Sequence, residues 1–398
     1  MRKILIISAV FPPEPVVSAL LSRDIAVRLS KNHKVFVLCP NPSRPEGYQF
    51  PNLKEPTNYK VIRLNSFLSP DSKIIGRLRE SYSLGKHCAE YIAKNAKDID
   101  CIYINSWPLA SQYLIIKAAR KSGIPSVLHI QDIYPESLIG KLPKIARNVF
   151  YNMLLPVDHY ILRNATKVLC ISENMISYLS RTRKVERSKF ELIRNWQDDQ
   201  SFLNFTPGMH DDLIFTFMYV GSISSSAGVA LLIHAFHKAN LKECRLLIIG
   251  NGAEKQDCVE LARKFDNQHI EFLEVIPEEV PAMQSKADVL LLPLKKGISL
   301  TATPSKLTAY LFSAKPVIAC VEPESDVANI LKDCHCGVVT DPENVDALAL
   351  VMKKVRKKEN AELEEMGQKG KRYAILNLSK EANLSRVITI IEDTILWK

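Results

Sequence analysis

Short runs of aliphatic and β-branched residues alternate with longer amphipathic stretches along all 398 residues, and this alternation limits the fold more than any other feature. Repeated βαβ units produce such a pattern, because parallel strands are buried on both faces and helices connect them. We therefore predict an α/β protein with a doubly wound parallel sheet in each half. At roughly 100–200 residues per domain, the length accommodates both sheets.

Thirteen runs are short and apolar enough to be strands. In the first half they are Ile4–Ser8, Lys34–Cys39, Lys60–Leu64, Cys101–Asn105, Ser126–Ile130, Lys167–Ile171 and Phe190–Ile193. In the second half they are Ile214–Val220, Arg245–Ile249, Ile270–Leu273, Val289–Leu292, Pro316–Ala319 and Gly337–Val339. Ligands bind at the carboxyl ends of strands in such sheets, so the residues that directly follow these runs are the candidates for function.

The segment Asn195–Asp212 is polar, aromatic and without a sustained period, and we interpret it as a linker with a boundary near residue 205. The predicted domains are residues 1–200 and 205–375. The tail 380–398 is predicted to be a helix that packs back on the first domain. Its apolar residues lie at helical spacing: Leu384, Val387, Ile388, Ile391 and Ile395.

Composition excludes collagen-like, mucin-like and largely disordered chains, because 46% of the residues are hydrophobic and 24% are charged. The net charge of +10 is concentrated in residues 1–200, which hold 30 Lys and Arg against 17 Asp and Glu. This excess indicates either an anionic partner, such as a membrane surface, or a solvated basic face. Nucleic acid is disfavoured, because the charges are dispersed and no recognition motif is present.

The nine cysteines have no regular spacing and indicate reduced, mostly buried thiols in a cytoplasmic protein. Residues 334–336, Cys-His-Cys, lack a second ligand pair at finger-like spacing, so no metal site is predicted. The start, MRKILIISAVFPP, imitates a secretion signal but ends at two prolines without a cleavage site, and fits a first strand better. No stretch approaches the roughly 18–20 apolar residues that span a bilayer, so we expect a protein that is soluble or at most peripheral.

Residues 302–319, ATPSKLTAYLFSAKPVIA, predict a helix, with Thr303 as N-cap and Pro304 in the first helical position. Lys306 then lies in the first turn, where free N–H groups already form a positive pole. A bound phosphate would stabilise both the lysine and the helix terminus. The alternative is a lysine that extends into solvent.

Three loops in the same half strengthen the phosphate interpretation. Lys295 and Lys296 follow one strand, Gly250 and Gly252 follow another, and Gly221 ends a third. Glycine after a strand is usually turn chemistry, but it also lets backbone amides approach a ligand closely. Together with the lysines, these loops indicate a nucleotide-diphosphate site.

In the first half, Gln131, Asp132 and Tyr134 follow the strand that ends at Ile130. Asp132 is either a site carboxylate or a cap for the next segment. His129 lies inside the strand, where a lone histidine is more often a hydrogen-bonded core residue than a catalyst. Ser172 and Glu173 are interpreted as a helix cap.

Taken in order, several motifs resemble family-four glycosyltransferases of the GT-B fold, in particular the bacterial O-antigen and capsule branch with fucosamine-transferase-like members. The segments that carry the resemblance are FPPEPVVSALLSRDIAVRLSKNHKVFVL, HIQDIYPES, CISENMISYLS, IRNWQDD, YVGSI, IIGNGAEKQ and PSKLTAYLFSAKPVIA. The resemblance covers nearly the whole chain. It implies two Rossmann-like domains facing a cleft, with the acceptor in the first domain and a nucleotide sugar in the second.

The resemblance also implies roles for particular residues. Those expected to hold or border the donor are Gly221, Ser222, Gly250, Asn251, Lys295, Thr301, Ser305 and Lys306, with Gly250 and Asn251 near the base. Gln131 and Asp132 would line the reacting sugar or the acceptor, and Lys306 would stabilise the leaving group. No metal or other cofactor is implied, and a UDP-sugar is favoured over a GDP-sugar, with a deoxyamino sugar as the expected donor.

The sequence departs from the family at several of these positions. The two glutamates that the family separates by seven intervening residues are replaced by Thr301 and Ala309, with Glu322 or Glu324 as candidate substitutes. The usual Arg and Lys of the YVG loop are Ser222 and Ala227. Pro15, Val16 and Val17 replace glycines of the first-domain loop.

The resemblance implies a retaining transferase of surface-polysaccharide synthesis. Residues 73–87 and 141–155 mix cations with apolar residues, which fits either a polyprenyl-diphosphate or other glycan acceptor at the inner membrane face, or ordinary core and solvent-facing helices. Two alternative functions stay open. One is a sugar-nucleotide epimerase of similar architecture, which would need no acceptor, and the other is a transferase-like subunit without catalysis.

Overall fold

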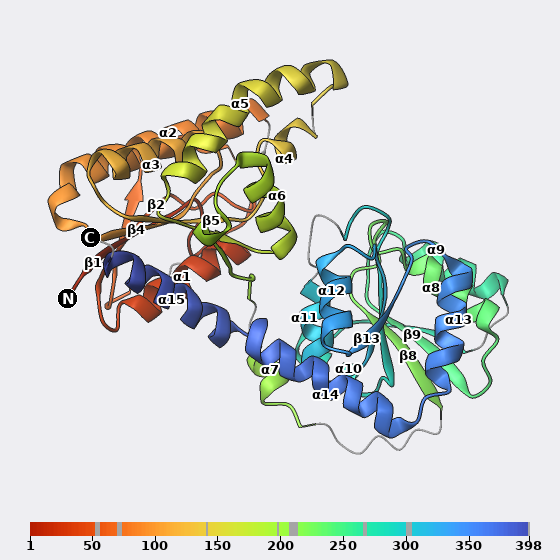
Figure 1. The fold of residues 1–398 in the computed structure, drawn as a ribbon. Helices are drawn as coiled ribbons and strands as arrows, with labels where there is room; N and C mark the ends of the chain where they lie inside the picture. Colours follow the sequence, from red (N-terminus) through yellow and green to blue (C-terminus); the bar gives the residue numbers. More distant parts are fainter. Residues whose placement is uncertain are drawn as a thin grey trace. The chain divides into compact units, whose positions relative to one another are not determined.

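The computed structural model describes residues 1–51, 56–69, 74–140, 142–196, 199–206, 214–265, 269–299 and 305–396. The chain divides into two compact units (Figure 1). Unit 1 consists of residues 1–195 and 383–398, and unit 2 of residues 196–382.

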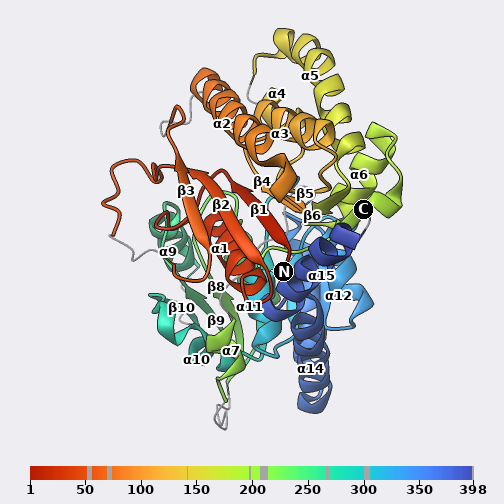
Figure 2. The same ribbon diagram turned by 90° about the vertical axis from the view of Figure 1, so that its left-hand side faces the viewer.

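Unit 1 is built on a seven-stranded parallel sheet with the order β3-β2-β1-β4-β5-β6-β7, and Figure 2 shows β3, β2 and β1 side by side. Its strands are β1 (Lys3–Ser8), β2 (Lys34–Pro40), β3 (Lys60–Leu64), β4 (Cys101–Asn105), β5 (Ser126–Ile130), β6 (Lys167–Cys170) and β7 (Phe190–Leu192). The chain winds outward from β1 in one direction and then from β4 in the other. The strand order therefore reverses between β1 and β4, where sheets of this type bind ligands.

Helices cover both faces of this sheet. They are α1 (Val17–Leu29), α2 (Ile74–Asn95), α3 (Ala110–Lys121), α4 (Glu136–Ile139), α5 (Lys144–Asn164) and α6 (Glu173–Arg183). One face packs Leu5 and Ile7 of β1 into a core shared with α2, α3, α5 and α6. As predicted, Ser172 caps α6, because its Oγ accepts a hydrogen bond from Met175 N at 3.1 Å.

Helix α15 (Lys380–Leu396) covers part of unit 1 beside α1, and both views show the two together (Figures 1 and 2). Its apolar residues Leu384, Val387 and Ile391 are buried, as the helical spacing predicted. Glu392 Oε1 lies 2.9 Å from His33 Nε2, which follows α1.

Unit 2 has a six-stranded parallel sheet with the order β10-β9-β8-β11-β12-β13. Its strands are β8 (Phe215–Val220), β9 (Cys244–Ile249), β10 (Ile270–Leu273), β11 (Val289–Pro293), β12 (Val317–Cys320) and β13 (Gly337–Thr340). Here the order reverses between β8 and β11. The prediction of a doubly wound parallel sheet in each half is confirmed, with every expected strand present and its ends within one residue.

The helices of unit 2 form two layers. They are α7 (Gln200–Leu203), α8 (Val229–Ala239), α9 (Lys255–Lys264), α10 (Val280–Ser285), α11 (Ser305–Phe312), α12 (Asp326–Asp333), α13 (Val345–Arg356) and α14 (Asn360–Asn377). One face of the sheet packs on α8, α9 and α13, and the other packs on α11, α12 and α14. The alternation along β8 explains this division, because Phe217 and Tyr219 belong to the first core and Met218 and Val220 to the second.

The expected linker differs from the structure. Part of the segment Asn195–Asp212 forms the short helix α7, and unit 1 ends at Asn195 rather than near residue 205. The reason is aromatic packing: Phe202 of α7 stacks on Phe312 of α11, with ring centroids 6.1 Å apart. This contact joins α7 to unit 2. Within the described ranges, no helix combines the length and hydropathy needed to cross a bilayer.

Candidate functional site

The donor-site candidates of unit 2 gather where the chain leaves β8 and β9. Gly221 follows β8 with φ +150°, and Gly250 follows β9 with φ +157°, both in a region that side chains rarely adopt. A Cβ on Gly250 would overlap the carbonyl oxygen of Gly221. The two loops therefore require glycine because they pack directly on one another.

The backbone amides of these glycines are not available to a ligand. Gly221 N donates to Ile249 O at 2.9 Å, and Gly250 N donates to Leu273 O at 2.9 Å, so both continue the sheet ladder. Gly252 N donates to Asn251 Oδ1 at 2.9 Å. The sheet and the turn therefore already use the amide hydrogens of these three glycines.

Lys306 packs against Gly221 from the first turn of α11. A Cβ on Gly221 would overlap Lys306 Cε and would lie 3.2 Å from Nζ. The ammonium lies 5.1 Å from the centroid of the Tyr219 ring, within the range of cation–π attraction. Lys306 thus lies at the carboxyl edge of the sheet, beside the end of β8.

This lysine has no counter-charge among the residues that the structure describes. Partial burial alone lowers the pKa of Lys306 below its ordinary value, and no carboxylate acts in the opposite direction. A half-buried ammonium without a carboxylate is unfavourable unless an anion binds beside it. The position is therefore suited to a phosphate.

Tyr310 fixes the position of Lys306, although the sequence indicates only that it belongs to the apolar face of the helix. It lies one turn further along α11 and is fully buried. Its hydroxyl accepts a hydrogen bond from Val220 N at 2.9 Å and donates to Val220 O at 3.1 Å. Because Val220 is the last residue of β8, this pair of bonds joins α11 to the strand whose end Lys306 reaches. The signal was its spacing of four residues from Lys306, which places both on one face of the helix.

The remaining donor-site candidates are distributed around this centre. Ser222 and Asn251 are exposed on the two loops. Lys295 is exposed after β11 and lines a hollow that also includes Glu254 and Asp257, rather than packing on Gly221.

Ser305 lies on another face of α11 from Lys306 and lines a small hollow with Phe202 and Thr308. Thr301 lies outside the described residues, as do Thr303 and Pro304, so the predicted helix start belongs to a part of the chain that the structure does not describe.

The carboxylate of Glu322 holds the loop after β11 in place through two hydrogen bonds. One carboxylate oxygen accepts a hydrogen bond from Gly297 N and the other accepts one from Ser299 Oγ. Burial acts to raise the pKa of Glu322, but these hydrogen bonds outweigh it and hold the pKa below its ordinary value. Both carboxylate oxygens of Glu322 therefore already accept hydrogen bonds within unit 2.

Unit 1 contains a pocket of about 160 Å³ at its own strand-order reversal. Its lining comes from the loops that follow β1, β4 and β5, with contributions from α1 and α3. The lining residues are Ala9, Val10, Ser18, Asn105, Ser106, Trp107, Pro108, Gln112, His129, Ile130, Gln131, Asp132 and Tyr134. The two site residues predicted in this half, Gln131 and Asp132, are both among them.

Three neighbouring residues of this pocket, Asp132, Gln131 and His129, differ in exposure and in hydrogen bonding. Asp132 is exposed and makes no capping hydrogen bond to α4, so of the two predicted roles the cap is excluded. Gln131 Oε1 accepts a hydrogen bond from Asn195 Nδ2 at 2.7 Å. His129 is 1% exposed, its Nδ1 lies 2.7 Å from Tyr103 Oη, and burial lowers its pKa to about 4.

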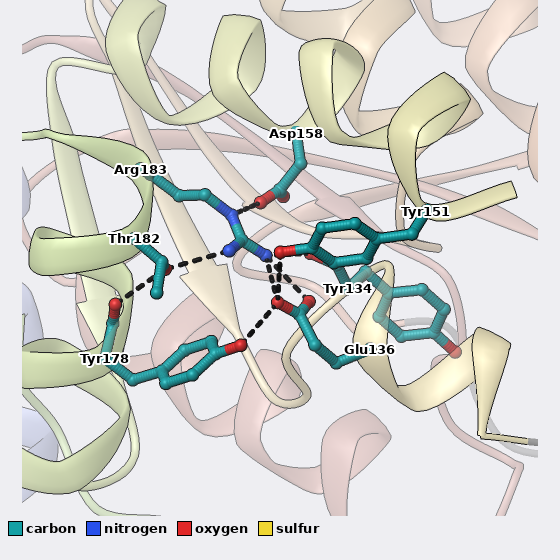
Figure 3. A network of polar contacts seen from close by, with 7 residues as sticks. All are labelled: Tyr134, Glu136, Tyr151, Asp158, Tyr178, Thr182 and Arg183. Carbon is teal, nitrogen blue, oxygen red and sulfur yellow. Dashed lines mark hydrogen bonds and ion pairs between the residues drawn. The ribbon is translucent and has the colours of Figure 1, made fainter. Parts of the chain in front are cut away.

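A buried arginine holds the segment that carries Gln131 and Asp132 (Figure 3). Arg183 Nη2 donates to Tyr134 O at 3.0 Å and to both oxygens of Glu136 at 2.7 and 2.8 Å. Its Nε donates to Asp158 Oδ2 at 2.7 Å. One fully buried guanidinium therefore joins α4, α5 and α6, and fixes the loop after β5 through its backbone. No local sequence pattern indicates this network, because its members are far apart in the chain.

Comparison with known proteins agrees with these two units. Residues 21–201 match the family described as Glycosyltransferase Family 4, and residues 210–373 match the one described as Glycosyl transferases group 1. The chain belongs to the family-four glycosyltransferases. The resemblance noted in the sequence is thus confirmed at the level of the family.

Two curated proteins that are similar to this chain in sequence are also named as glycosyltransferases. They are the probable glycosyltransferase WbjE of Pseudomonas aeruginosa, 22% identical, and the putative colanic acid biosynthesis glycosyl transferase WcaI of Escherichia coli K12, 23% identical. Each alignment covers 58% of this chain and 60% of the relative. The match therefore spans less than two thirds of either relative.

Among solved structures, Anabaena Alr3699/HepE in complex with UDP has a TM-score of 0.64 at 15% identity, with all of both chains covered. At this identity the likeness supports the fold alone. It agrees with two Rossmann-like units of the GT-B type.

Proposed function

We propose that this chain transfers a sugar from a nucleotide-diphosphate donor, bound in unit 2, to a glycan acceptor, bound in unit 1, during synthesis of a bacterial surface polysaccharide. The observation that carries the proposal is Lys306, a half-buried ammonium without a counter-charge among the described residues, which lies against Gly221 at the carboxyl edge of the sheet. Such a group matches the leaving diphosphate of a nucleotide sugar. The name of WcaI, a putative colanic acid biosynthesis glycosyl transferase, supports the pathway class.

The proposed reaction retains the configuration of the sugar. The bond between the anomeric carbon and the β-phosphate oxygen breaks first, and the electron pair stays on the phosphate. That oxygen takes the proton of the acceptor hydroxyl, whose oxygen then bonds to the same face of the anomeric carbon. The products are a glycoside and a nucleoside diphosphate, and atoms and charge balance without a metal. Lys306 stabilises the negative charge that develops on the phosphate.

We further propose UDP as the nucleotide, with a deoxyamino sugar. The UDP complex of HepE supports this choice, because that protein shares the fold. A thermal-shift screen against UDP, GDP and dTDP with their sugars tests it. A UDP-sugar should raise the melting temperature of unit 2 most, and a larger shift with GDP or dTDP would contradict the choice.

The experiment that tests the function is a turnover assay with a UDP-sugar, in which released UDP and the sugar nucleotide are both measured with and without a glycan acceptor. Transfer predicts UDP release that increases with acceptor. An epimerase would instead convert the sugar nucleotide to its isomer without acceptor. Absence of turnover alone, with activity only beside a partner transferase, would favour a subunit without catalysis.

A peripheral membrane contact is part of the proposal, and the exposed face of α2 supports it. This face is formed by residues at helical spacing that mix apolar and cationic side chains: Ile75, Leu78, Arg79, Tyr82 and Lys86. Ile75 is 83% exposed and Tyr82 is 56% exposed. Apolar side chains flanked by cations are typical of helices that lie in the interface of an anionic bilayer.

Helix α5 extends the same surface, because α2 and α5 both pack against α3 on one face of the sheet. Val149 and Met153 of α5 are 69% and 58% exposed and lie one turn apart. We propose that these two helices hold unit 1 against anionic lipid, near a polyprenyl-diphosphate-linked acceptor at the cytoplasmic face of the membrane.

Flotation with vesicles of phosphatidylcholine and phosphatidylglycerol tests the membrane contact. The chain should float with anionic vesicles at low salt, and the Ile75→Glu variant should not. Leu350→Glu is the matched control, since Leu350 is 53% exposed on α13 of unit 2. Equal flotation of all three proteins, or flotation that salt does not change, would remove the membrane claim.

A further inference from the structure

The pocket of unit 1 contains three buried nitrogen atoms without hydrogen-bond partners among the described residues. They are Trp107 Nε1, His129 Nε2 and Gln131 Nε2. Trp107 lies in the loop after β4, His129 lies in β5, and Gln131 directly follows β5. A buried polar group without a partner is uncommon in folded proteins, because it loses water and gains nothing in return.

His129 carries its free proton on Nε2. Tyr103 is fully buried, and among the described residues its hydroxyl has one hydrogen-bond partner, His129 Nδ1. The hydroxyl must donate to satisfy its hydrogen, so Nδ1 accepts. A neutral imidazole that accepts at Nδ1 carries its hydrogen on Nε2. Burial keeps this ring neutral, since its pKa is lowered to about 4.

Gln131 is oriented in the same sense by Asn195. Because Asn195 Nδ2 donates to Gln131 Oε1, the carbonyl end of the glutamine amide is occupied and the amino end is the one left unpaired. The indole of Trp107 is a donor only. All three unpartnered atoms are therefore N–H donors.

The other polar groups of the pocket differ, because several are already paired. Ser106 Oγ lies 2.6 Å from Ser111 Oγ, and Gln112 Nε2 donates to Ser106 O at 3.3 Å. Asn105 Nδ2 donates to Ser22 Oγ at 3.1 Å. The exposed carboxylate of Asp132 is an acceptor on the lining.

Two cations lie next to one of these donors, Trp107. The guanidinium carbons of Arg44 and Arg77 lie 4.6 and 4.9 Å from the Trp107 ring centroid. Glu80 accepts hydrogen bonds from Arg44 and lies 3.8 Å from Arg77. Two guanidiniums beside the indole favour an electron-rich oxygen as the acceptor for Trp107 Nε1.

We propose that this pocket binds an acceptor-sugar substituent whose oxygen accepts hydrogen bonds and donates none, namely an acetamido carbonyl or a carboxylate, through Trp107, His129 and Gln131. The inference rests on the proposed transfer function and specifies its acceptor class: an N-acetylated or uronic acid sugar, rather than one with hydroxyls alone. A substituent of this kind satisfies all three donors at once. A hydroxyl at the same place would add a donor where donors are already in excess.

Binding of three simple glycosides to the full chain, followed by saturation-transfer NMR, tests the proposal. The probes are the methyl glycosides of N-acetylglucosamine, glucuronic acid and glucose. One of the first two should bind at least tenfold more tightly than the glucoside, since leaving buried donors unpaired weakens binding by about this factor or more. The preferred probe distinguishes the carbonyl from the carboxylate. Equal binding of all three, or none, would overturn the proposal.

Two variants examine the donors themselves. Gln131→Glu replaces the free N–H with an oxygen at nearly constant volume, and should weaken the preferred probe about tenfold. Asn195→Asp acts from outside the pocket, since the introduced carboxylate can only accept, which turns the Gln131 amide and presents its carbonyl to the ligand. Both variants should have the same effect. Gln49→Glu is the matched control on an exposed loop of unit 1, and should bind as the unchanged chain does.

If both variants bind the preferred probe as tightly as the unchanged chain does, the pocket assignment is refuted. The proposed function is tested separately by hydrolysis of a UDP-sugar, because this reaction depends on unit 2 and needs no glycan probe. Hydrolysis with no probe preference would refute only the acceptor class. Probe preference with no hydrolysis or transfer would leave the pocket as a glycan-binding site and refute the transferase.

Discussion

The replacement of Lys306 by methionine should decrease sugar transfer by about 10²–10³ in kcat. Methionine preserves the packing of the side chain against Gly221 and removes only the charge. An ammonium about 4 Å from a phosphate charge contributes about 4 kcal/mol at an effective dielectric of about 20. Removal of one preorganised electrostatic group from a transition state costs about 3–4 kcal/mol, which corresponds to the stated decrease.

The assay is single-turnover formation of the glycoside at saturating donor, so that weaker donor binding does not enter the rate. Lys353→Met is the control, because Lys353 is exposed in the last turn of α13 and far from β8 in sequence. The reasoning is refuted if Lys306→Met keeps more than a third of the rate, or if Lys353→Met loses as much.

Three further predictions follow from the contacts around the two sites. Gly221→Ala should slow transfer by displacing Lys306, because the new Cβ overlaps Lys306 Cε. The double variant Gly221→Ala, Lys306→Met should transfer sugar no more slowly than Lys306→Met alone, and a double-mutant cycle of transfer rates measures this. Tyr310→Phe should lower the free energy of unfolding of unit 2 by about 1–3 kcal/mol, seen as a lower midpoint in urea, because it leaves Val220 N and O unpaired; an unchanged midpoint contradicts the role of the hydroxyl. The contribution of His129 to the stability of unit 1 should be lost between pH 6.5 and pH 4, by about 3 kcal/mol, because the unfolded chain protonates His129 with a pKa of 6.5 and the folded chain only at about 4. Asp158, whose pKa burial raises to about 6, acts in the opposite direction, so the loss is measured by urea unfolding at both pH values as the difference between the unchanged chain and His129→Asn.

The fold could be predicted because its strands are buried on both faces. A run such as Val289–Leu292 is apolar at every position, and glycine, proline or charged residues bound it on both sides. The linker was less predictable, since α7 exists through the contact of Phe202 with Phe312, two residues that are distant in sequence. Local pattern contains no information on such a pair.

The candidate sites could be predicted only in part, for the same reason. Lys306 and Gln131 follow strands at the expected edge of each sheet, and their positions were evident from the sequence. The use of the Gly221 and Gly250 amides by the sheet was not, because it depends on strands that pair across crossovers. The role of Arg183 was not evident from the sequence either, because its ion-pair partners Asp158 and Glu136 lie 25 and 47 positions away in the chain.

The return of residues 383–398 to unit 1 affects how the chain is made. Arg194 N donates to Asn383 Oδ1 at 2.9 Å, and Leu384, Val387 and Ile391 complete an apolar face of the first unit. A ribosome therefore produces all of unit 2 before the last segment of unit 1 emerges. Until then the nascent first unit exposes the surface that α15 later covers, so this protein should depend on chaperones during translation more than a chain whose domains are continuous in sequence.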